Sequence, residues 1–360
     1  MNSSSNKRRL SKQQTRRIAN RQQDALRTTQ PGGEGAVGAE SSVDSALEQC
    51  NGRVVGHYGK QLEVEALGDD RSVVAAVTAR CHQRANLPPV VAGDLVVWEA
   101  DEDGQGVVVA RGQRRNAFGR ASGRVNKPMA ANVDLVLVMV AVVPEAFCGL
   151  IDRYVVAVEA LGLPLLLVIN KSDLMDESNV ARIDGMVSLY GSLGYPVHLI
   201  SVRDGDGLAA LNEKLTGLTA VLVGQSGVGK SSLVNALGVR DLAQTGALSK
   251  RKSKGKGTHT TTTARLYHLV NFNLIDSPGI REFGLDHIEE ADIWRGFVEF
   301  RPFLGQCKYR DCSHQHEPGC ALREALARGQ LRQERFDSCF QILHEHGAAP
   351  SSRSALSDSS

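Results

Sequence analysis

The stretch Gly224–Ser231, GQSGVGKS, limits what this chain can fold into more than any other part of the sequence. It fits the pattern G-x-x-x-x-G-K-[ST], follows the apolar run TAVLV and precedes the helix-like run SSLVNAL. This is the strand–loop–helix context that a phosphate-binding loop requires. Glycines let backbone N–H groups turn toward phosphate oxygens, and the start of the helix adds partial positive charge.

Two side chains of this loop have individual roles. Lys230 can reach the β- and γ-phosphates of a nucleoside triphosphate, and the hydroxyl of Ser231 can bind Mg²⁺. The residues expected to contact the nucleotide here are Gly224, Gln225, Ser226, Gly227, Val228, Gly229, Lys230, Ser231 and Ser232.

A second motif, NKSD at residues 170–173, ends the apolar run LPLLLVI and predicts which base is bound. The Asp173 carboxylate accepts from two adjacent donors, which guanine offers at N1–H and N2–H₂, whereas adenine presents a lone pair. Asn170 can bind the base edge and connect neighbouring loops, and the Lys171 stem can cover the ring. Ser172, the third residue of the motif, is also expected to contact the nucleotide. Ser201, at the end of the run VHLIS, is expected to contact guanine O6. These residues favour GTP over ATP.

A third motif, NLIDSPG, places Asp276 at the end of a predicted strand and Gly279 three residues later. Asp276 is expected to hold Mg²⁺ through its water shell, and the Gly279 N–H to sense the γ-phosphate. Ile280 follows where many GTPases carry a glutamine that orients water. We therefore expect slow unassisted hydrolysis, about 10⁻⁴ to 10⁻² s⁻¹, and a partner that completes the site.

Between these motifs lies LSKRKSKGKGTHTTTTARL, a cationic, glycine-containing loop at the position of a first switch. One of Thr260 to Thr263 is expected to cover Mg²⁺ in the GTP state. His259 can bind or orient a water molecule, although a structural loop histidine is the alternative. The same charges could simply be solvated.

These motifs stand in an unusual order, because the base reader precedes the phosphate loop. If the usual termini of a GTP-binding domain lie close together, they can be joined and the chain opened elsewhere without changing the site. The segment after Gly279 then leads directly to a C-terminal Cys/His cluster. We therefore hypothesise that a γ-phosphate-dependent shift at Gly279 reaches the C-terminal domain.

The sequence divides into regions that differ in their pattern of apolar and polar residues. Short β-type runs separated by turns predict a small OB or SH3-like barrel, and alternating buried-strand and helical patterns predict a doubly wound parallel sheet. The fold class is thus multidomain: an N-terminal β-barrel, a central α/β P-loop GTPase domain in circularly permuted order, and a mainly helical zinc-binding domain. The expected boundaries are 1–45 (disordered basic arm), 46–115 (barrel), 116–285 (GTPase domain), 286–346 (zinc-binding domain) and 347–360 (disordered tail).

Charge and composition argue against a membrane or secreted protein and favour binding to RNA. No apolar run reaches the ~18 residues that a membrane span needs, and the start of the chain lacks a secretory h-region. Residues 1–27 are basic, and an organellar transit peptide is an alternative for them, although their apolar face is poor. The basic arm, the Arg-rich connector RGQRRNAFGRASGRVNKP and the cationic loop favour salt-sensitive binding to RNA phosphates, with plain surface solvation as the alternative.

The run CKYRDCSHQHEPGC contains three of the seven cysteines and predicts a metal site. Cys307, Cys312, His314 and Cys320 supply three thiolates and one imidazole, a closed tetrahedral set typical of structural Zn²⁺. His316 is the alternative imidazole. Cys50, Cys81, Cys148 and Cys339 are expected to be ordinary thiols.

A barrel, a permuted GTP-binding domain and a Cys/His cluster, in this order, resemble the RsgA (YjeQ) family of circularly permuted bacterial GTPases over roughly residues 50 to 345. The resemblance implies an OB-fold, zinc ligands at the four positions named, and late maturation of the 30S ribosomal subunit with 16S rRNA as partner. It also implies that His259, Thr261 (with Thr260 close behind) and Gly279 are the candidate catalytic residues, and that Ser231, Thr261 and Asp276 hold magnesium.

The expected activity is GTP hydrolysis in a cytoplasmic monomer with GTP or GDP, Mg²⁺ and one structural Zn²⁺. The GTP state is expected to bind rRNA, the subunit to stimulate hydrolysis, and hydrolysis to release the protein, with other assembly factors as further partners. A nucleotide-gated RNA- or protein-binding scaffold is the alternative from another class, and a metal-handling GTPase is a weaker third.

Overall fold

The computed structural model describes residues 50–58, 61–68, 73–100, 105–122, 125–238, 264–276, 285 and 288–348. Two compact units are present: one contains the described residues of 1–117, 130–132 and 263–266, and the other those of 118–129, 133–262 and 267–360. No helix of the described residues is long and apolar enough to cross a membrane.

The first unit is a closed five-stranded barrel with strand order β1-β2-β3-β5-β4. Its strands are β1 (Gly52–Tyr58), β2 (Gln61–Leu67), β3 (Val73–Gln83), β4 (Leu95–Ala100) and β5 (Gln105–Arg111). β3 and β5 pair in parallel, and the other pairs are antiparallel. Alternating apolar residues such as Val54, Leu62 and Val108 fill the interior. The predicted OB-type barrel is confirmed.

The Arg-rich connector contains secondary structure that its sequence did not predict. β6 (Ala117–Ser122) and β7 (Val125–Ala131) form a two-stranded sheet. Phe118 and Ala130 are fully buried and anchor it. The many arginines and glycines of this segment hide the apolar alternation on which a strand prediction depends.

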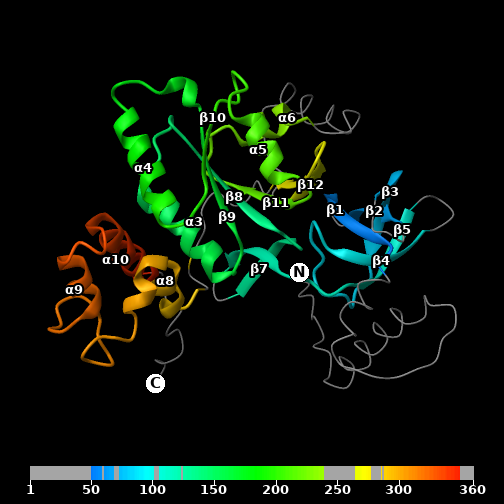
Figure 1. The fold of residues 1–360 in the computed structure, drawn as a ribbon. Helices are drawn as coiled ribbons and strands as arrows, with labels where there is room; N and C mark the ends of the chain where they lie inside the picture. The colour runs from blue at the N-terminus through cyan, green and yellow to red at the C-terminus, as the bar shows by residue number, and fades with distance from the viewer. Residues whose placement is uncertain are drawn as a thin grey trace, which may run out of the picture. The chain divides into compact units, whose positions relative to one another are not determined.

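A six-stranded sheet has the strand order β10-β9-β8-β11-β13-β12, and apart from the first two residues of β12 it belongs to the second unit (Figure 1). Pairing is parallel between β10 and β9, β9 and β8, β8 and β11, and β11 and β13. The strands are β8 (Leu135–Ala141), β9 (Leu165–Asn170), β10 (Val197–Ile200), β11 (Thr219–Val223), β12 (Arg265–His268) and β13 (Asn273–Asp276). β8 and β9 are buried on both faces, which explains their nearly continuous apolar sequences.

Helices cover both faces of this sheet. α3 (Cys148–Ala160) and α4 (Val180–Ser192) lie on one side, and α5 (Leu208–Leu215) and α6 (Lys230–Ala236) on the other (Figure 1). The short helix η1 (Ser172–Leu174) lies within the predicted base-reading motif. α3 ends as expected, because Gly162 adopts the left-handed conformation (φ 63°) just beyond it.

The C-terminal part contains α8 (Glu290–Gly296), η2 (Val298–Phe303), α9 (Ala321–Ala327) and α10 (Gln333–Ala348). Between residues 288 and 348, all of which are described, no strand is present. α8 approaches α3 so closely that a Cβ on Gly296 would lie 2.9 Å from the Cα of Val156. The mainly helical character predicted for this region is confirmed. The exact domain boundaries stay predictions.

Candidate guanine nucleotide site and metal group

Four motif-bearing segments end at the same edge of the parallel sheet. β9 ends at Asn170, β10 ends one residue before Ser201, β11 ends one residue before Gly224, and β13 ends at Asp276. The carboxyl ends of parallel strands meet at one edge, where α/β proteins bind ligands. Asp276 pairs with Leu222 of β11, which brings it beside the phosphate loop. The spatial neighbours are therefore preserved although the order along the chain is changed.

Asn170 joins three of these loops and is 2% exposed. Its Nδ2 donates to the Val228 carbonyl of the phosphate loop at 2.8 Å, and the Val202 N–H donates to its Oδ1 at 3.2 Å. The sequence predicted that Asn170 would connect loops, but it did not reveal that Val228 and Val202 are the partners. The segments that carry the predicted base-reading and phosphate-binding motifs are thus held together by one side chain.

The Asp173 carboxylate is positioned by the protein on one side. Its Oδ1 accepts from the Ser201 hydroxyl at 2.8 Å, and its Oδ2 lies 3.8 Å from Nη1 of Arg203. The Ser201 N–H donates to the Asp206 carbonyl at 3.0 Å. Ser201 therefore orients the Asp173 carboxylate, and its expected contact with guanine O6 stays a prediction.

Lys171 spans from the base-reading loop to the phosphate loop. Its backbone is left-handed (φ 64°), and its Nζ donates to the carbonyls of Val143 at 2.6 Å and Gly227 at 2.9 Å. The ammonium is thereby fixed at one end, which leaves the apolar stem available to cover a ring. Ser172 follows in η1.

The phosphate loop has a backbone that requires its glycines. Gly224 has φ 145°, and a Cβ there would lie 2.1 Å from the Met139 carbonyl oxygen. Gly229 has φ 102°, and a Cβ there would lie 2.5 Å from Nδ2 of Asn170. Both glycines are thus needed for turn conformation and for close approach of neighbouring groups.

Lys230 donates to the carbonyls of Gly224 and Gln225, both at 2.6 Å. Its ammonium therefore lies over the loop where phosphates are expected. Ser226, Ser231 and Ser232 are exposed, as is Gly227, whereas Val228 is buried. The predicted Mg²⁺ ligand Ser231 is accordingly accessible. His259, Thr260, Thr261, Gly279 and Ile280 lie outside the described residues.

The Cys/His residues of the C-terminal part come together as one group. The ligand atoms of Cys307, Cys312, His314 and Cys320 all lie within 4.8 Å of one another. Nδ1 of His314 is 3.4 Å from both Cys307 Sγ and Cys320 Sγ, and these two sulfurs are 3.9 Å apart. A tetrahedral zinc ion with ordinary bond lengths would place sulfurs about 3.8 Å apart and a sulfur and nitrogen about 3.6 Å apart. The group therefore has the dimensions of a zinc site.

Two features distinguish His314 within this group. Burial lowers the pKa of its imidazole, which favours the neutral form that binds metals. Its left-handed backbone (φ 63°) is unusual for a residue other than glycine, and such strain often occurs at functional positions. His316 is not part of the group.

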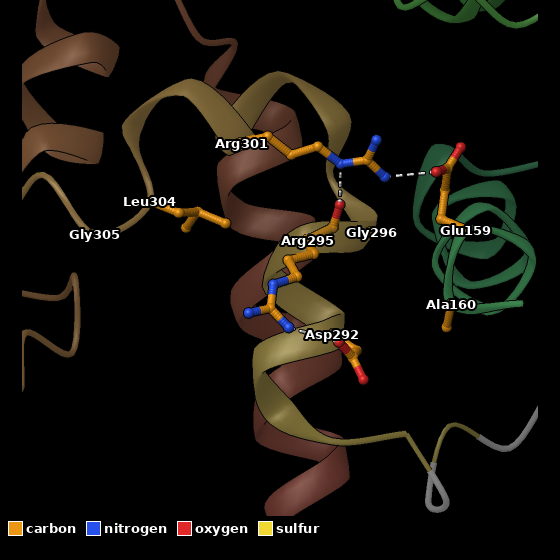
Figure 2. A pocket seen from close by; sticks show the side chains of 8 residues that line it. All are labelled: Glu159, Ala160, Asp292, Arg295, Gly296, Arg301, Leu304 and Gly305. Atoms are coloured by element: carbon orange, nitrogen blue, oxygen red, sulfur yellow. Dashed lines mark hydrogen bonds and ion pairs between the residues drawn. The ribbon is translucent and has the colours of Figure 1, made fainter. Parts of the chain in front are cut away.

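Sequence reasoning missed a cavity of about 620 Å³ on the C-terminal part, lined by Glu159, Ala160, Asp292, Arg295, Gly296, Arg301, Leu304 and Gly305 (Figure 2). None of these residues belongs to the predicted nucleotide or zinc sets. Its charges are already paired, since Arg301 contacts Glu159 at 2.5 Å and Arg295 contacts Asp292 at 3.1 Å. The cavity therefore offers no evident catalytic group.

Comparison with known proteins agrees with this geometry. The RsgA GTPase family model matches residues 111–286. The small ribosomal subunit biogenesis GTPase RsgA of Pseudomonas fluorescens strain SBW25 is 45% identical over 339 residues, covering 94% of this chain and 97% of the relative. The protein of the same name from Azotobacter vinelandii strain DJ is 47% identical with the same coverage.

Two solved structures are also similar. YjeQ from Thermotoga maritima has a TM-score of 0.65 and 30% identity, covering 83% of this chain and 99% of that one. YloQ, described as a circularly permuted GTPase, has a TM-score of 0.63 and 28% identity, covering 82% and 94%. With the phosphate loop, the base reader and their reversed order in place, this chain belongs to the RsgA GTPase family and is a circularly permuted, GTP-hydrolysing enzyme.

Proposed function

We propose that this GTPase acts in late maturation of the 30S ribosomal subunit. In this proposal the GTP-bound form binds 16S rRNA, the subunit stimulates hydrolysis, and hydrolysis releases the protein. The observation that supports the proposal is the Asn170 junction, which joins the segments predicted to bind a guanine nucleotide, in a chain whose relatives are small ribosomal subunit biogenesis GTPases. We infer a cytoplasmic monomer, since subunits are assembled there, with other assembly factors as its neighbours on the subunit.

The nucleotide contacts follow from the loops described above. Asp173 would read the guanine edge, Lys230 would bind the β- and γ-phosphates, and Ser231 with Thr261 would hold Mg²⁺ directly. Asp276, at the end of β13 beside β11, would hold the ion through water. Magnesium would neutralise charge developing on the phosphates.

Catalysis would depend on a partner. Ile280 cannot orient water, so we assign this role to His259, with the Gly279 N–H sensing the γ-phosphate. A partner surface that fixes the first-switch segment would raise the rate. His259→Ala should leave GDP affinity nearly unchanged while abolishing subunit-stimulated turnover.

The metal group would bind one structural Zn²⁺. Three thiolates and one imidazole leave no open coordination position, so the ion would stabilise the C-terminal part rather than take part in hydrolysis. A tightly held, non-exchanging zinc would exclude the metal-handling interpretation.

RNA binding is supported by charge rather than by a base-reading pattern. Positive side chains gather in the arm, the connector and the segment 250–256, including Lys250, Arg251, Lys252, Lys254 and Lys256. Binding should therefore be dominated by phosphate contacts and weaken steeply with salt.

The decisive experiment measures GTP turnover with and without purified 30S subunits, using 50S subunits as the matched control. Stimulation of more than about hundredfold by 30S subunits only would support the proposal, in keeping with the effects of GTPase activators. Equal rates with and without subunits, together with nucleotide-dependent RNA or protein binding, would instead establish a nucleotide-gated scaffold.

A further inference from the structure

Large apolar side chains gather on the GTPase domain beside the predicted base-reading motif. In the part of the chain that the structure describes, nine large apolar or aromatic side chains are exposed, and four of them belong to two short segments, 142–147 and 171–184. A single exposed apolar side chain needs no explanation, but a group of them indicates a surface that another molecule covers. The four are Val143 (51% exposed), Phe147 (62%), Leu174 (41%) and Val180 (38%).

The first segment, the loop between β8 and α3, is bound to the second by two side chains. Arg182 of α4 donates to the carbonyls of Ala146 at 3.2 Å and Val142 at 3.3 Å. Lys171 donates to the carbonyl of Val143, as described above. Both ends of the loop therefore lie against the second segment, and the two exposed apolar side chains of the loop lie beside that segment.

The second segment is held together by Asn179. Its Nδ2 donates to the Leu174 carbonyl at 3.1 Å, and its Oδ1 accepts from the Asp176 N–H at 3.0 Å. Asn179 directly precedes Val180, so the turn that begins at Leu174 is closed at the start of α4. The four apolar side chains therefore surround one junction between the β8–α3 loop and α4, and together they form what we call the apolar patch.

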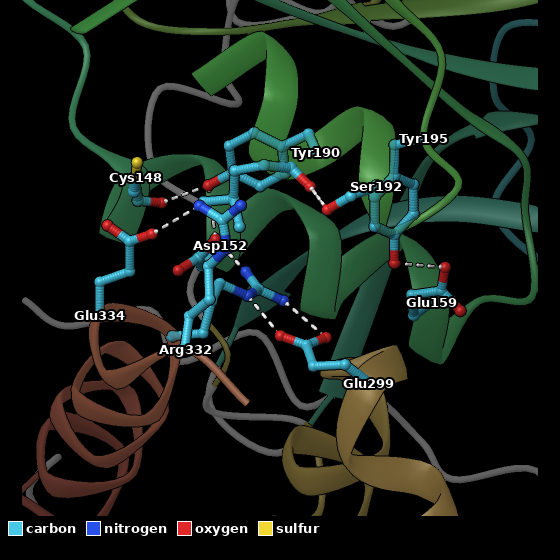
Figure 3. Close-up of polar contacts among 11 residues, drawn as sticks. Cys148, Asp152, Glu159, Tyr190, Ser192, Tyr195, Glu299, Arg332 and Glu334 are labelled. Carbon is cyan, nitrogen blue, oxygen red and sulfur yellow. Dashed lines mark hydrogen bonds and ion pairs between the residues drawn. The ribbon is translucent and has the colours of Figure 1, made fainter. Parts of the chain in front are cut away.

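The helices that flank the apolar patch are fixed by buried polar contacts. The Tyr190 hydroxyl of α4 donates to the Cys148 carbonyl at 3.0 Å and to Asp152 of α3 at 2.6 Å (Figure 3). Asp152 is fully buried and also pairs with Arg335 of α10. Cys148 directly follows Phe147, so the most exposed side chain of the patch stands on a fixed backbone. A partner would therefore bind a preformed surface, which loses little entropy on binding.

The charge around the apolar patch is negative. The two segments contain five acidic residues and two basic ones, Lys171 and Arg182. Both basic side chains are half-buried and engaged in the contacts above, and Arg182 also pairs with Glu145 at 3.2 Å. The surface beside the patch therefore offers carboxylates to a partner. The exposed ones are those of Asp176, Glu177 and Asp184.

This combination of apolar and acidic side chains selects the kind of partner. RNA and an anionic membrane surface would both be repelled, because both carry negative charge. A basic protein segment would instead pair with the carboxylates while its apolar side chains cover the patch. We propose that the apolar patch binds a Lys- or Arg-rich segment of a protein of the 30S subunit, with Phe147 as the central contact. The inference rests on the proposed function and adds a protein contact to the proposed RNA contacts.

The test uses the full-length, zinc-loaded protein with magnesium, a non-hydrolysable GTP analogue and purified 30S subunits. Phe147→Ser removes the aromatic ring, and because Phe147 is the N-cap residue of α3, where serine is favourable, the helix is not weakened. Glu177→Lys reverses one charge beside the patch. Glu213→Lys is the matched control, because Glu213 is equally exposed but lies on α5. The measurements are the dissociation constants for 30S subunits and for GDP.

We expect Phe147→Ser to weaken binding to 30S subunits at least about tenfold and Glu177→Lys to weaken it about three- to tenfold. GDP affinity should change less than about twofold in each variant. The control Glu213→Lys measures the effect of net charge alone. If RNA covers the patch, Glu177→Lys should bind more tightly than Glu213→Lys, because it removes a repulsion. That result, or unchanged binding of Phe147→Ser, would overturn the proposal.

Photochemical cross-linking identifies the molecule that covers the patch. With p-benzoylphenylalanine in place of Phe147, illumination of the complex should join the protein to a Lys- or Arg-rich peptide of a 30S protein. The same amino acid in place of Val270, which is 51% exposed outside the patch, should not reach that peptide. Cross-linking from position 147 to 16S rRNA alone, or to nothing, would contradict the proposal. If the wild type fails to bind 30S subunits, the proposed function fails too, whereas normal binding by every variant refutes this inference only.

Discussion

Replacing Asn170 by alanine tests whether this one side chain assembles the nucleotide site. The change removes the donor to the Val228 carbonyl and the acceptor for the Val202 N–H. Val228 is buried, whereas Val202 is only half-buried, so water can reach one of the two groups left behind. A buried polar group without a partner costs about 1–3 kcal/mol, which gives about 2–3 kcal/mol for the pair. Because a nucleotide needs the two loops together, binding must supply the free energy that Asn170 no longer does, and affinity should fall by up to about 30- to 150-fold.

The assay is competition between GDP and a fluorescent guanine nucleotide, with circular dichroism to confirm that the variant is folded. Asn179→Ala is the control, because the half-buried Asn179 makes the same kinds of contact, to the Leu174 carbonyl and the Asp176 N–H, but both hydrogen bonds are exposed to solvent. It should change affinity by less than about twofold. A folded Asn170→Ala protein whose affinity falls less than about fivefold would refute the reasoning, since the two hydrogen bonds would then be worth less than about 1 kcal/mol.

Three further outcomes are expected. Asp173→Asn should weaken GDP at least about hundredfold and favour xanthosine diphosphate, because an amide donates where the carboxylate accepted; competition binding measures this, and unchanged preference contradicts it. Zinc removal should expose Trp294, whose ring centroid lies 4.8 Å from that of His314. In a Trp98→Phe background its fluorescence should then shift to longer wavelength, and no shift on treatment with a chelator would contradict a metal site. Burial lowers the pKa of His198, so the folded state prefers the neutral ring. The free energy of unfolding should therefore decrease as pH falls below about 6.5, because the unfolded chain takes up the proton more readily. Urea unfolding at pH 7.5 and 5.5 should show a loss below about 1 kcal/mol that His198→Gln lacks; an equal loss in the variant would contradict it.

The strands that carry the nucleotide motifs could be predicted because their signals are local. β8, β9 and β11 are buried on both faces, so their apolar runs stand out, and each motif follows directly from a strand end. The metal group could be predicted for the same reason, because its four residues lie within one short segment of the sequence. Four ligands within one short segment have little freedom in the fold, and the structure brings them together at zinc-like distances.

The contacts of α10 could not be predicted because their signals are distant. Arg335 reads as an ordinary charge on a polar helix, and its partner Asp152 lies 183 positions away in the chain. Neither residue has a neighbour in sequence that reveals its burial. The connector strands β6 and β7 were missed for a different reason, since a single buried aromatic, Phe118, does not make a recognisable alternation.

The strand order has a consequence for biosynthesis. β8, β9 and β10 are adjacent in the sheet and are translated before β11, so the segments predicted to read guanine are synthesised before the segment that carries Lys230. A chain that ends before β11 therefore lacks the residues predicted to bind the phosphates. β13, which pairs with β11 and brings Asp276, is added later still. A guanine nucleotide would therefore gain its full set of predicted contacts only after β13 has been translated.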